Sequence, residues 1–348
     1  MAELRWLLGR YGHYTRKILA SDNIMPHEFL REFLPALCEL KIDIELFYES
    51  KANLRKEDIR LYRDVGMRNF QPGIESLSTP VLRLMRKGIS SGLHNVQILK
   101  WCRQFGLEPS WNYLVGFPGE QPEHYEEQEA WAWAIQHLTP PAYCGPIRFD
   151  RFSPYFVAPN TFEVSKLQPY PSYRFIYPEL NEDELFDIAY FFIGEFEGQD
   201  KINEYTLPLR NAIADWQSNA ERYSLFSIST KDILLICDSR KGADEPILEV
   251  SGPAMLILNT CSDRITNRYS LLNLVDSRKD VFRNIQVLEQ ALTWLTHKRL
   301  LLWEGENCIS LVIPLGDGYK PPHVGAHHLS SLNLADTEEI IVTSSLGN

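Results

Sequence analysis

The chain has 348 residues, of which 44% are aliphatic, aromatic or cysteine and 23% are charged, a composition typical of globular proteins rather than of disordered or collagen-like chains. Its formal net charge of −11 argues against a broad nucleic-acid-binding surface, which needs clustered lysine and arginine. The sequence has no secretory-type apolar run at its start and no stretch of about 18 apolar residues elsewhere. We therefore expect a cytoplasmic protein of one large or two ordinary domains.

The N-terminal half predicts alternating strands and helices. Short strand-like apolar runs lie at residues 17–20, 44–48, 69–74, 110–115 and 147–152. Amphipathic segments separate the first four of these runs, at residues 28–40, 55–65 and 80–105. Gly66 and Gly106 follow two of these segments, at positions where a positive φ commonly ends a helix. Strands that alternate with helices predict a parallel sheet with right-handed crossovers.

The predicted fold class is therefore α/β, with a partial (β/α) TIM-like barrel. The chain opens on a helical pattern at residues 3–10 with no strand before it, as a truncated or permuted barrel would. Pro26 and Pro80 stand just inside two predicted helix starts, and Thr79 is a candidate cap for the second.

The remainder of the chain has a different pattern. A segment rich in proline and aromatic residues, 154–178, is expected to wrap over the barrel face, and residues 181–195 and 207–222 have helical patterns. Further on, the sequence predicts short antiparallel strands at 233–237 and 248–250, helices at 254–262 and 282–297, and a hairpin turning at 304–307. We expect four parts: a partial barrel (1–153), an aromatic wrap with helices (154–225), a small α+β winged-helix-like domain (226–315) and a flexible tail (316–348).

The six cysteines are dispersed along the chain. They lie at positions 38, 102, 144, 237, 261 and 308, so that neighbouring cysteines are at least 24 residues apart and neither CxxC nor CxxxCxxC occurs. Most of them stand among apolar residues, and we interpret them as small core side chains. The histidines show no HExxH or similar spacing, so the sequence predicts no metal site.

The segment after the third predicted strand is the first candidate for a binding site. Active sites of β/α barrels form where the carboxyl ends of the strands meet. Glu75 and Ser76 stand at such an end, and their side chains are suited to hydrogen-bond ribose hydroxyls. The pattern equally allows both residues to cap the helix that starts near Pro80.

The loop after the fourth strand is the second candidate. It reads Gly116, Phe117, Pro118, Gly119 and Glu120. Its two glycines let the backbone approach a flat ligand closely, whereas a simple turn before a helix capped by Glu120 fits the spacing as well. The loop is neither GxGxxG nor a phosphate-binding loop.

Polar residues also end the other predicted strands. Asp22 and Asn23 follow the first strand, residues 49–51 end the second, and Arg148, Asp150 and Arg151 lie along or just beyond the fifth. Buried charges need partners, so charged groups at successive strand ends favour a polar ligand over separate surface ion pairs.

Several of these segments together resemble the radical S-adenosylmethionine (SAM) superfamily, and more narrowly its cobalamin-dependent branch that matures ribosomally made peptides and includes C-methyltransferases. The resemblance rests on the runs that start at Leu46, Gln71, Trp111, Cys144 and Tyr205 and on the C-terminal domain. It covers nearly the whole chain before the tail, and it implies that the first strand here is the family's second, so that the barrel lacks its first strand.

The resemblance implies cofactor-binding roles for named residues. Asp22 and Asn23 match the residues that bind the methionine end of SAM, and Glu75 and Ser76 match a ribose-contacting pair. The loop from Gly116 through Phe117, Pro118 and Gly119 to Glu120 matches the loop beside the adenine, and Arg148 and Asp150 follow a strand near the cofactor.

The chain departs from that family in one respect. Family members hold a [4Fe–4S] cluster with three cysteines in a CxxxCxxC loop and carry an N-terminal cobalamin domain, and this sequence contains no such cysteine motif. The resemblance thus implies a truncated or split enzyme that retains part of the SAM site, acts on a precursor peptide, and works with a separate chain supplying the cobalamin domain and the cluster loop. The alternative is a noncatalytic peptide-binding or scaffolding protein. No nucleic acid or membrane partner is expected.

Overall fold

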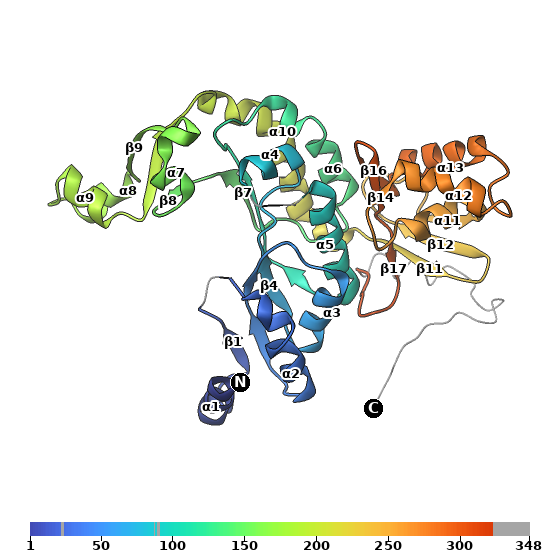
Figure 1. The fold of residues 1–348 in the computed structure, drawn as a ribbon, viewed down its shortest axis with the longest axis horizontal. Coiled ribbons are helices and arrows are strands. Elements are labelled where there is room, and N and C mark those ends of the chain that lie inside the picture. The colour runs from blue at the N-terminus through green and yellow to red at the C-terminus, as the bar shows by residue number, and fades with distance from the viewer. Residues whose placement is uncertain (22–23, 87, 89–90, 323–348) are drawn as a thin grey trace.

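The computed structural model describes residues 1–21, 24–86, 88 and 91–322 (Figure 1). The chain starts with α1 (Ala2–Tyr11), as the helical pattern at residues 3–10 predicts. Parallel strands covered by helices follow, then a projecting arm, and last an α+β unit at the opposite end of the molecule.

The N-terminal strands form three separate parallel groups. The first consists of β1 (Lys17–Leu19) and β2 (Glu45–Phe47), the second of β3 (Glu49–Ser50), β4 (Asn69–Pro72) and β5 (Glu108–Pro109), and the third of β6 (Asn112–Val115) and β7 (Tyr143–Pro146). The parallel α/β architecture is confirmed. Within the described residues these strands close no barrel, and the partial TIM-like barrel is not confirmed.

Helices cover one side of these strands. They include α2 (Phe33–Glu39), α3 (Lys56–Asp64), α5 (Gly92–Phe105), α6 (Gln128–Ala134) and α10 (Ile202–Asn219). Aromatic contacts hold them in place: Tyr62 of α3 packs edge-on against Phe70 of β4, with ring centroids 5.1 Å apart. Trp216 of α10 packs on Trp111 at 6.1 Å, and both indoles are almost fully buried. Aromatic side chains supply much of the apolar area that such a core removes from water.

Two predicted helices are each split in the structure. The first segment gives the short η1 (His27–Leu30) and then α2, and the long segment at 80–105 gives α4 (Thr79–Leu84) and α5. Gly66 and Gly106 have φ of +82° and +70°, as predicted from their places after helices. Thr79 does not cap α4, because Ser78 is its N-cap residue; Thr79 instead accepts a hydrogen bond from Gly92 N–H and donates one to Glu304.

The fifth predicted strand is wrong in position and partner. The strand parallel to β6 is β7, which ends at Pro146. Residues 149–150 form β8 (Phe149–Asp150), which pairs antiparallel with β10 (Phe191–Glu195). Arg148, Asp150 and Arg151 therefore belong to the next part of the chain rather than to a parallel strand end.

The proline- and aromatic-rich segment forms a projecting arm rather than a wrap (Figure 1). Its sheet has the order β8-β10-β9, with β9 at Ser165–Pro169, and its helices are α7 (Pro154–Val157), η3 (Pro159–Phe162), α8 (Ser172–Ile176) and α9 (Glu182–Ile188). Phe149, Val164, Ala189 and Phe192 form a small core of its own. The helix predicted over 181–195 is thus half wrong, because its second half is β10.

The C-terminal unit combines two sheets with three helices. One sheet has the order β13-β12-β11-β17, made of β11 (Leu225–Ser229), β12 (Ile233–Asp238), β13 (Ile247–Ser251) and β17 (Ile313–Pro314). The other has the order β14-β16-β15, made of β14 (Thr266–Asn267), β15 (Leu301–Glu304) and β16 (Asn307–Ser310), and its hairpin turns where predicted. The helices are α11 (Gly252–Thr260), α12 (Arg268–Ser277) and α13 (Ile285–His297), of which α12 was not predicted.

Short 3-10 turns complete the secondary structure, namely η2 (Pro122–Tyr125), η4 (Gln199–Lys201) and η5 (Ala220–Arg222). The predicted tail starts too early: Tyr319 is only 6% exposed and packs on Phe226 of β11 at 5.8 Å. Residues 323–348 lie outside the described residues. No helix of the described residues is long and apolar enough to span a membrane.

Candidate functional site

Within the described residues, one side of the parallel strands is not covered by helices. Paired residues in parallel strands share a side, and successive residues alternate between sides. Glu49 pairs with Gln71, and Asn112 pairs with Tyr143, whereas their buried chain neighbours Phe70 and Tyr113 face the helices. The residues of the uncovered side are all partly or fully exposed: Lys17, Leu19, Glu45, Phe47, Glu49, Asn69, Gln71, Glu108, Asn112, Leu114 and Tyr143. This open polar face is the natural place for a ligand.

A cavity of about 200 Å³ adjoins this face at the strand ends. Glu75 and Phe117 line it, which brings one residue of each predicted loop together. Leu114 of β6 lies at its base, and Tyr155 and Phe162 of the arm contribute aromatic walls. The wall is therefore mainly apolar and aromatic beside one carboxylate and the guanidinium of Arg86, an arrangement suited to a flat ring that carries polar substituents.

The backbone of Glu75 ties two strand groups together. Its carbonyl oxygen accepts a hydrogen bond of 2.8 Å from Leu114 N–H, so β6 is joined to the loop after β4. Its φ of +59° is uncommon for a residue with a side chain and is found where the surrounding structure fixes the backbone. The unusual conformation directs the following residues away from the cavity.

Ser76 follows that turn into the interior. Its side chain is fully buried, and its Oγ accepts a hydrogen bond from Ser78 N–H. Asn95 Nδ2 donates to its carbonyl oxygen at 2.8 Å. These contacts stabilise the approach to α4, whose N-cap residue is Ser78 itself. The structure thus brings Glu75, but not Ser76, to the cavity.

Hydrogen bonds to Glu120, the last residue of the loop that starts at Gly116, stabilise the loop. Glu120 Oε2 accepts hydrogen bonds from Gly116 N–H at 2.8 Å and from the Tyr205 hydroxyl of α10 at 3.2 Å. Burial raises the pKa of Glu120, although hydrogen bonds from Phe117, Tyr125, Gly116 and Tyr205 oppose that shift. Gly116 and Gly119 have φ of +81° and +88°, which favour glycine. Phe117 can therefore face the cavity while Glu120 fixes the turn.

Pro118 and Gly119 face a neighbouring cavity of about 300 Å³, which shares Leu84, Arg86 and Phe162 with the first. Arg86 lies over the Phe162 ring at 4.9 Å from its centroid. This cation–π contact connects α4 to the arm. The predicted loop thus lines both cavities: Phe117 lines the first, and Pro118 and Gly119 line the second. Arg86 and Phe162 line both.

The other predicted residues do not meet at this cavity. Asp22 and Asn23 lie outside the described residues. Arg148 and Asp150 form an exposed ion pair with each other at 2.7 Å, and Arg148 stacks on Phe191 of the arm at 3.6 Å. Their contacts belong to the arm sheet, because β8 pairs with β10.

Sequence reasoning missed Arg86, Tyr155 and Phe162, which line the cavity from α4 and the arm. The density of aromatic residues in 154–178 was a signal for a covering segment, and two aromatic residues of the arm do reach the cavity. No pattern in the sequence indicated which ones.

The cysteines do not form a three-ligand cluster in the described structure. Cys102, Cys237, Cys261 and Cys308 are buried, whereas Cys38 and Cys144 are half-buried in α2 and β7. Cys261 and Cys308 lie 3.7 Å apart, but the described residues contain no group of three or more potential metal ligands. The residues present therefore do not fit a [4Fe–4S] cluster.

Anaerobic reconstitution of the purified chain with iron and sulfide is expected to give no stoichiometric four-iron cluster, because three converging thiolates are needed to hold one. Iron and acid-labile sulfide analysis, together with the absorbance spectrum, measures this directly. Four irons and four sulfides per chain, lost in a Cys38→Ser or Cys144→Ser variant, would contradict the description of the thiols as dispersed.

Comparison with protein families gives one match over the N-terminal part of the chain. Residues 3–131 match the family described as the Radical SAM superfamily. This segment, about a third of the chain, is therefore similar to radical SAM superfamily domains. It contains β1 to β6, Glu75 and the Gly116–Glu120 loop, and it ends before the arm and the C-terminal unit. No curated protein matches the chain.

Two solved structures of cobalamin-dependent radical SAM enzymes match part of this chain. TsrM from Kitasatospora setae, with cobalamin and a [4Fe–4S] cluster bound, matches at TM-score 0.43 and 13% identity over 60% of this chain and 46% of its own. OxsB, with aqua-cobalamin and SAM bound, matches at TM-score 0.34 and 15% identity over 46% and 25%. The chain spans less than half the length of these proteins, and such likenesses are too weak to assign an activity.

Proposed function

We propose that this chain is the SAM-binding part of a split or truncated radical SAM protein that modifies a ribosomally made precursor peptide. The observation that carries the proposal is the cavity at the strand ends, where Glu75 and Phe117 meet inside the segment that matches the superfamily. Its chemistry suits the adenosine of SAM: Phe117 and Tyr155 offer ring faces for the base, and Glu75 offers acceptor oxygens for ribose hydroxyls.

The uncovered side of the strands supports an extended ligand next to that cavity. Glu49, Gln71 and Asn112 lie along it, and these side chains provide hydrogen-bonding groups for a peptide or for the methionine end of SAM. A cluster held outside these residues would supply the electron that radical SAM chemistry requires. This chain's own residues bind and orient the cofactor and the substrate, and the cluster and cobalamin would be supplied by a separate polypeptide.

The free edge of β1 is a candidate contact for such a partner. β1 pairs only with β2 in the described structure, and its last residue, Leu19, is 76% exposed. Exposed edge strands present unpaired backbone groups that another chain can pair with.

A noncatalytic scaffold is the second candidate function, and the C-terminal unit favours it. We propose that its helices α11, α12 and α13 and the sheet β14-β16-β15 form a winged-helix-like binding unit. Within the described residues, β13 is an edge strand of the adjoining sheet. Binding of peptide without binding of SAM would favour this function over the first.

Glu75→Ala is expected to weaken SAM binding by about 1.5–3 kcal/mol, because it removes charge-assisted hydrogen bonds to the ribose. Calorimetric titration of the wild type and the variant with SAM measures the change, and a thermal melt of each protein reports stability. Asp317→Ala is a matched control: this residue also has positive φ (+52°), but its carboxylate accepts a hydrogen bond from Gln104, remote from the cavity.

The control should lower stability and leave SAM affinity unchanged. If Glu75→Ala lowers the melting temperature and does not change SAM affinity, Glu75 acts only through the structure of its loop and the proposed cofactor site is wrong.

A further inference from the structure

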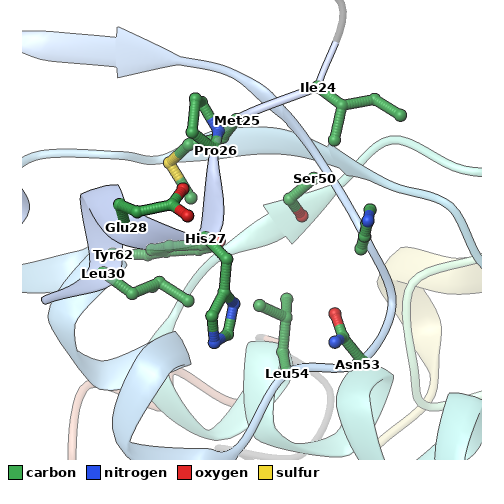
Figure 2. Close-up of a pocket in the computed structure, with 11 residues that line it drawn as sticks. Ile24, Met25, Pro26, His27, Glu28, Leu30, Ser50, Asn53, Leu54 and Tyr62 are labelled. Atoms are coloured by element: carbon green, nitrogen blue, oxygen red, sulfur yellow. The ribbon is translucent and has the colours of Figure 1, made fainter.

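A separate cavity lies on the helix-covered side of β3, away from the face described above. Its volume is about 380 Å³, within the range of roughly 300–1,000 Å³ of small-molecule sites. Residues 24–30, between β1 and α2, and residues 50–54, between β3 and α3, enclose it (Figure 2). Ser50 pairs with Pro72 and faces this side, whereas Glu49 and Gln71 face the uncovered side. The two sites are therefore separated by the strand itself.

Two buried hydroxyl groups lie next to each other at this cavity and have no other hydrogen-bond partner among the described residues. Ser50 is 5% exposed and Tyr62 is fully buried, and within the described structure neither hydroxyl makes a hydrogen bond of acceptable geometry. Burial raises the pKa of Tyr62, although the adjacent Ser50 hydroxyl opposes that shift, so the phenol stays protonated and can donate. Native proteins seldom leave such groups unsatisfied. Two adjacent unpaired hydroxyls beside an open cavity indicate that a ligand completes their hydrogen bonds.

Two opposite charges also line the cavity without neutralising each other. Glu28 and Lys51 both contribute to its wall, and neither forms an ion pair within the described part of the chain. Figure 2 shows the Glu28 carboxylate and the Ser50 hydroxyl pointing toward the space between the two loops. Opposite charges kept apart across a cavity are complementary to a molecule that carries both charges itself.

The rest of the wall is mainly apolar, with the polar side chains of His27 and Asn53 beside it. Met25, Leu30 and Leu54 supply apolar surface, and Met25 N–H donates a hydrogen bond of 2.8 Å to Glu49 carbonyl oxygen, which fixes one loop against β3. The wall has room for an aliphatic chain but presents no cluster of basic residues, which argues against phosphate-bearing ligands.

We propose that this cavity binds a free α-amino acid with an aliphatic side chain, in its zwitterionic form. Ser50 and Tyr62 donate to its carboxylate, with Lys51 contributing positive charge at the rim. Glu28 accepts from its ammonium group, and the side chain packs on the apolar wall. This proposal is independent of the function proposed for the uncovered face.

Calorimetry with three probes tests the charge pattern. Leucine should bind, whereas leucinamide, which lacks the carboxylate, and 4-methylpentanoate, which lacks the ammonium group, should each bind at least about tenfold more weakly. Absence of binding by leucine at millimolar concentration, or equal binding of leucine and 4-methylpentanoate, would overturn the proposal. Competitive displacement of leucine by SAM would assign the cavity to the cofactor and also overturn it.

Two variants locate the binding. Tyr62→Phe and Glu28→Gln should each weaken leucine binding by about tenfold. Tyr319→Phe is the matched control, since its hydroxyl is also buried and without a hydrogen bond of acceptable geometry but lies outside the cavity. Tyr62→Phe removes an unpaired hydroxyl and should keep its melting temperature. If Tyr62→Phe does not fold, the Glu28→Gln variant, which changes an exposed residue, tests the proposal by itself. Unchanged leucine affinity in Glu28→Gln would overturn the proposal.

Discussion

Arg240→Ala is expected to lower the free energy of unfolding by about 3–5 kcal/mol, because it leaves a buried carboxylate without its cation. The side chains of Arg240 and Asp238 are 0% and 3% exposed, and two hydrogen bonds of 2.6 and 2.9 Å join them. Arg240 Nη1 also donates to the carbonyl oxygens of Ala134 in α6 and Arg299 after α13, at 2.7 and 2.8 Å. One guanidinium therefore joins β12, α6 and the C-terminal helices.

Urea unfolding at neutral pH measures this effect. Arg174→Ala is the matched control, because Arg174 pairs with Glu182 where both side chains are more than 60% exposed, and exposed pairs contribute little. A double variant, Asp238→Leu with Arg240→Met, removes both charges and should recover much of the lost stability. Equal losses in Arg240→Ala and Arg174→Ala would show that the buried pair does not hold the units together.

The elements that the sequence predicts correctly are those whose own residues specify them. α3 has an apolar stripe at helical spacing and ends before Gly66, whose positive φ stops the helix. β13 alternates apolar and polar residues from Leu248 to Ser251, in step with its half-buried register, and its partner β12 is a short continuous apolar run. Such patterns follow from local geometry, so no knowledge of distant contacts is needed.

The errors occur where a distant partner decides. Residues 147–152 have the alternating pattern of a strand, but β6 pairs with residues 143–146 instead. Cys144, Gly145 and Pro146 give little indication of a strand in the sequence. The alternating segment then joins β10 of the arm instead. Pairing partners that are far apart in sequence override local preference, which is context-dependent for strands.

The candidate site shows the same division. Chain order alone places Glu75 and Phe117 at neighbouring strand ends, and the structure brings both to one cavity. The inward turn of Ser76 depends on the positive φ of Glu75. A positive φ can be expected from the sequence mainly at glycine, so a glutamate gives no sign of it. Tyr155 and Phe162 reach the cavity only because the arm folds around its own core.

Lys100 joins the parallel-strand part to the C-terminal unit through a buried amine. The residue is fully buried in α5, and its Nζ lies 2.7 Å from Ser262 carbonyl oxygen and 2.6 Å from Ser310 carbonyl oxygen. Burial lowers the pKa of Lys100 from 10.5 to about 7, with Asp263 opposing and Lys56 adding to the shift. A neutral amine has two N–H donors, which matches the two carbonyl acceptors.

The contribution of Lys100 to stability is therefore expected to increase with pH between about 7 and 10.5. In that range the unfolded chain carries a proton on this lysine and the folded chain does not, so raising the pH favours the folded state. The slope is at most about 1.4 kcal/mol for each pH unit. Below about pH 7 both states carry the proton and the contribution levels off at its lowest value.

Urea unfolding of the wild type and of Lys100→Met across this pH range isolates the effect, because other titrating groups cancel in the difference between the two proteins. Lys241→Met is the control, since Lys241 forms a partly exposed ion pair with Asp215 and should give a difference that changes little with pH. A difference between wild type and Lys100→Met that stays constant from neutral pH to pH 10 would show that Lys100 remains charged when folded. Its two short contacts to Ser262 and Ser310 would then be ammonium–carbonyl hydrogen bonds that outweigh the effect of burial.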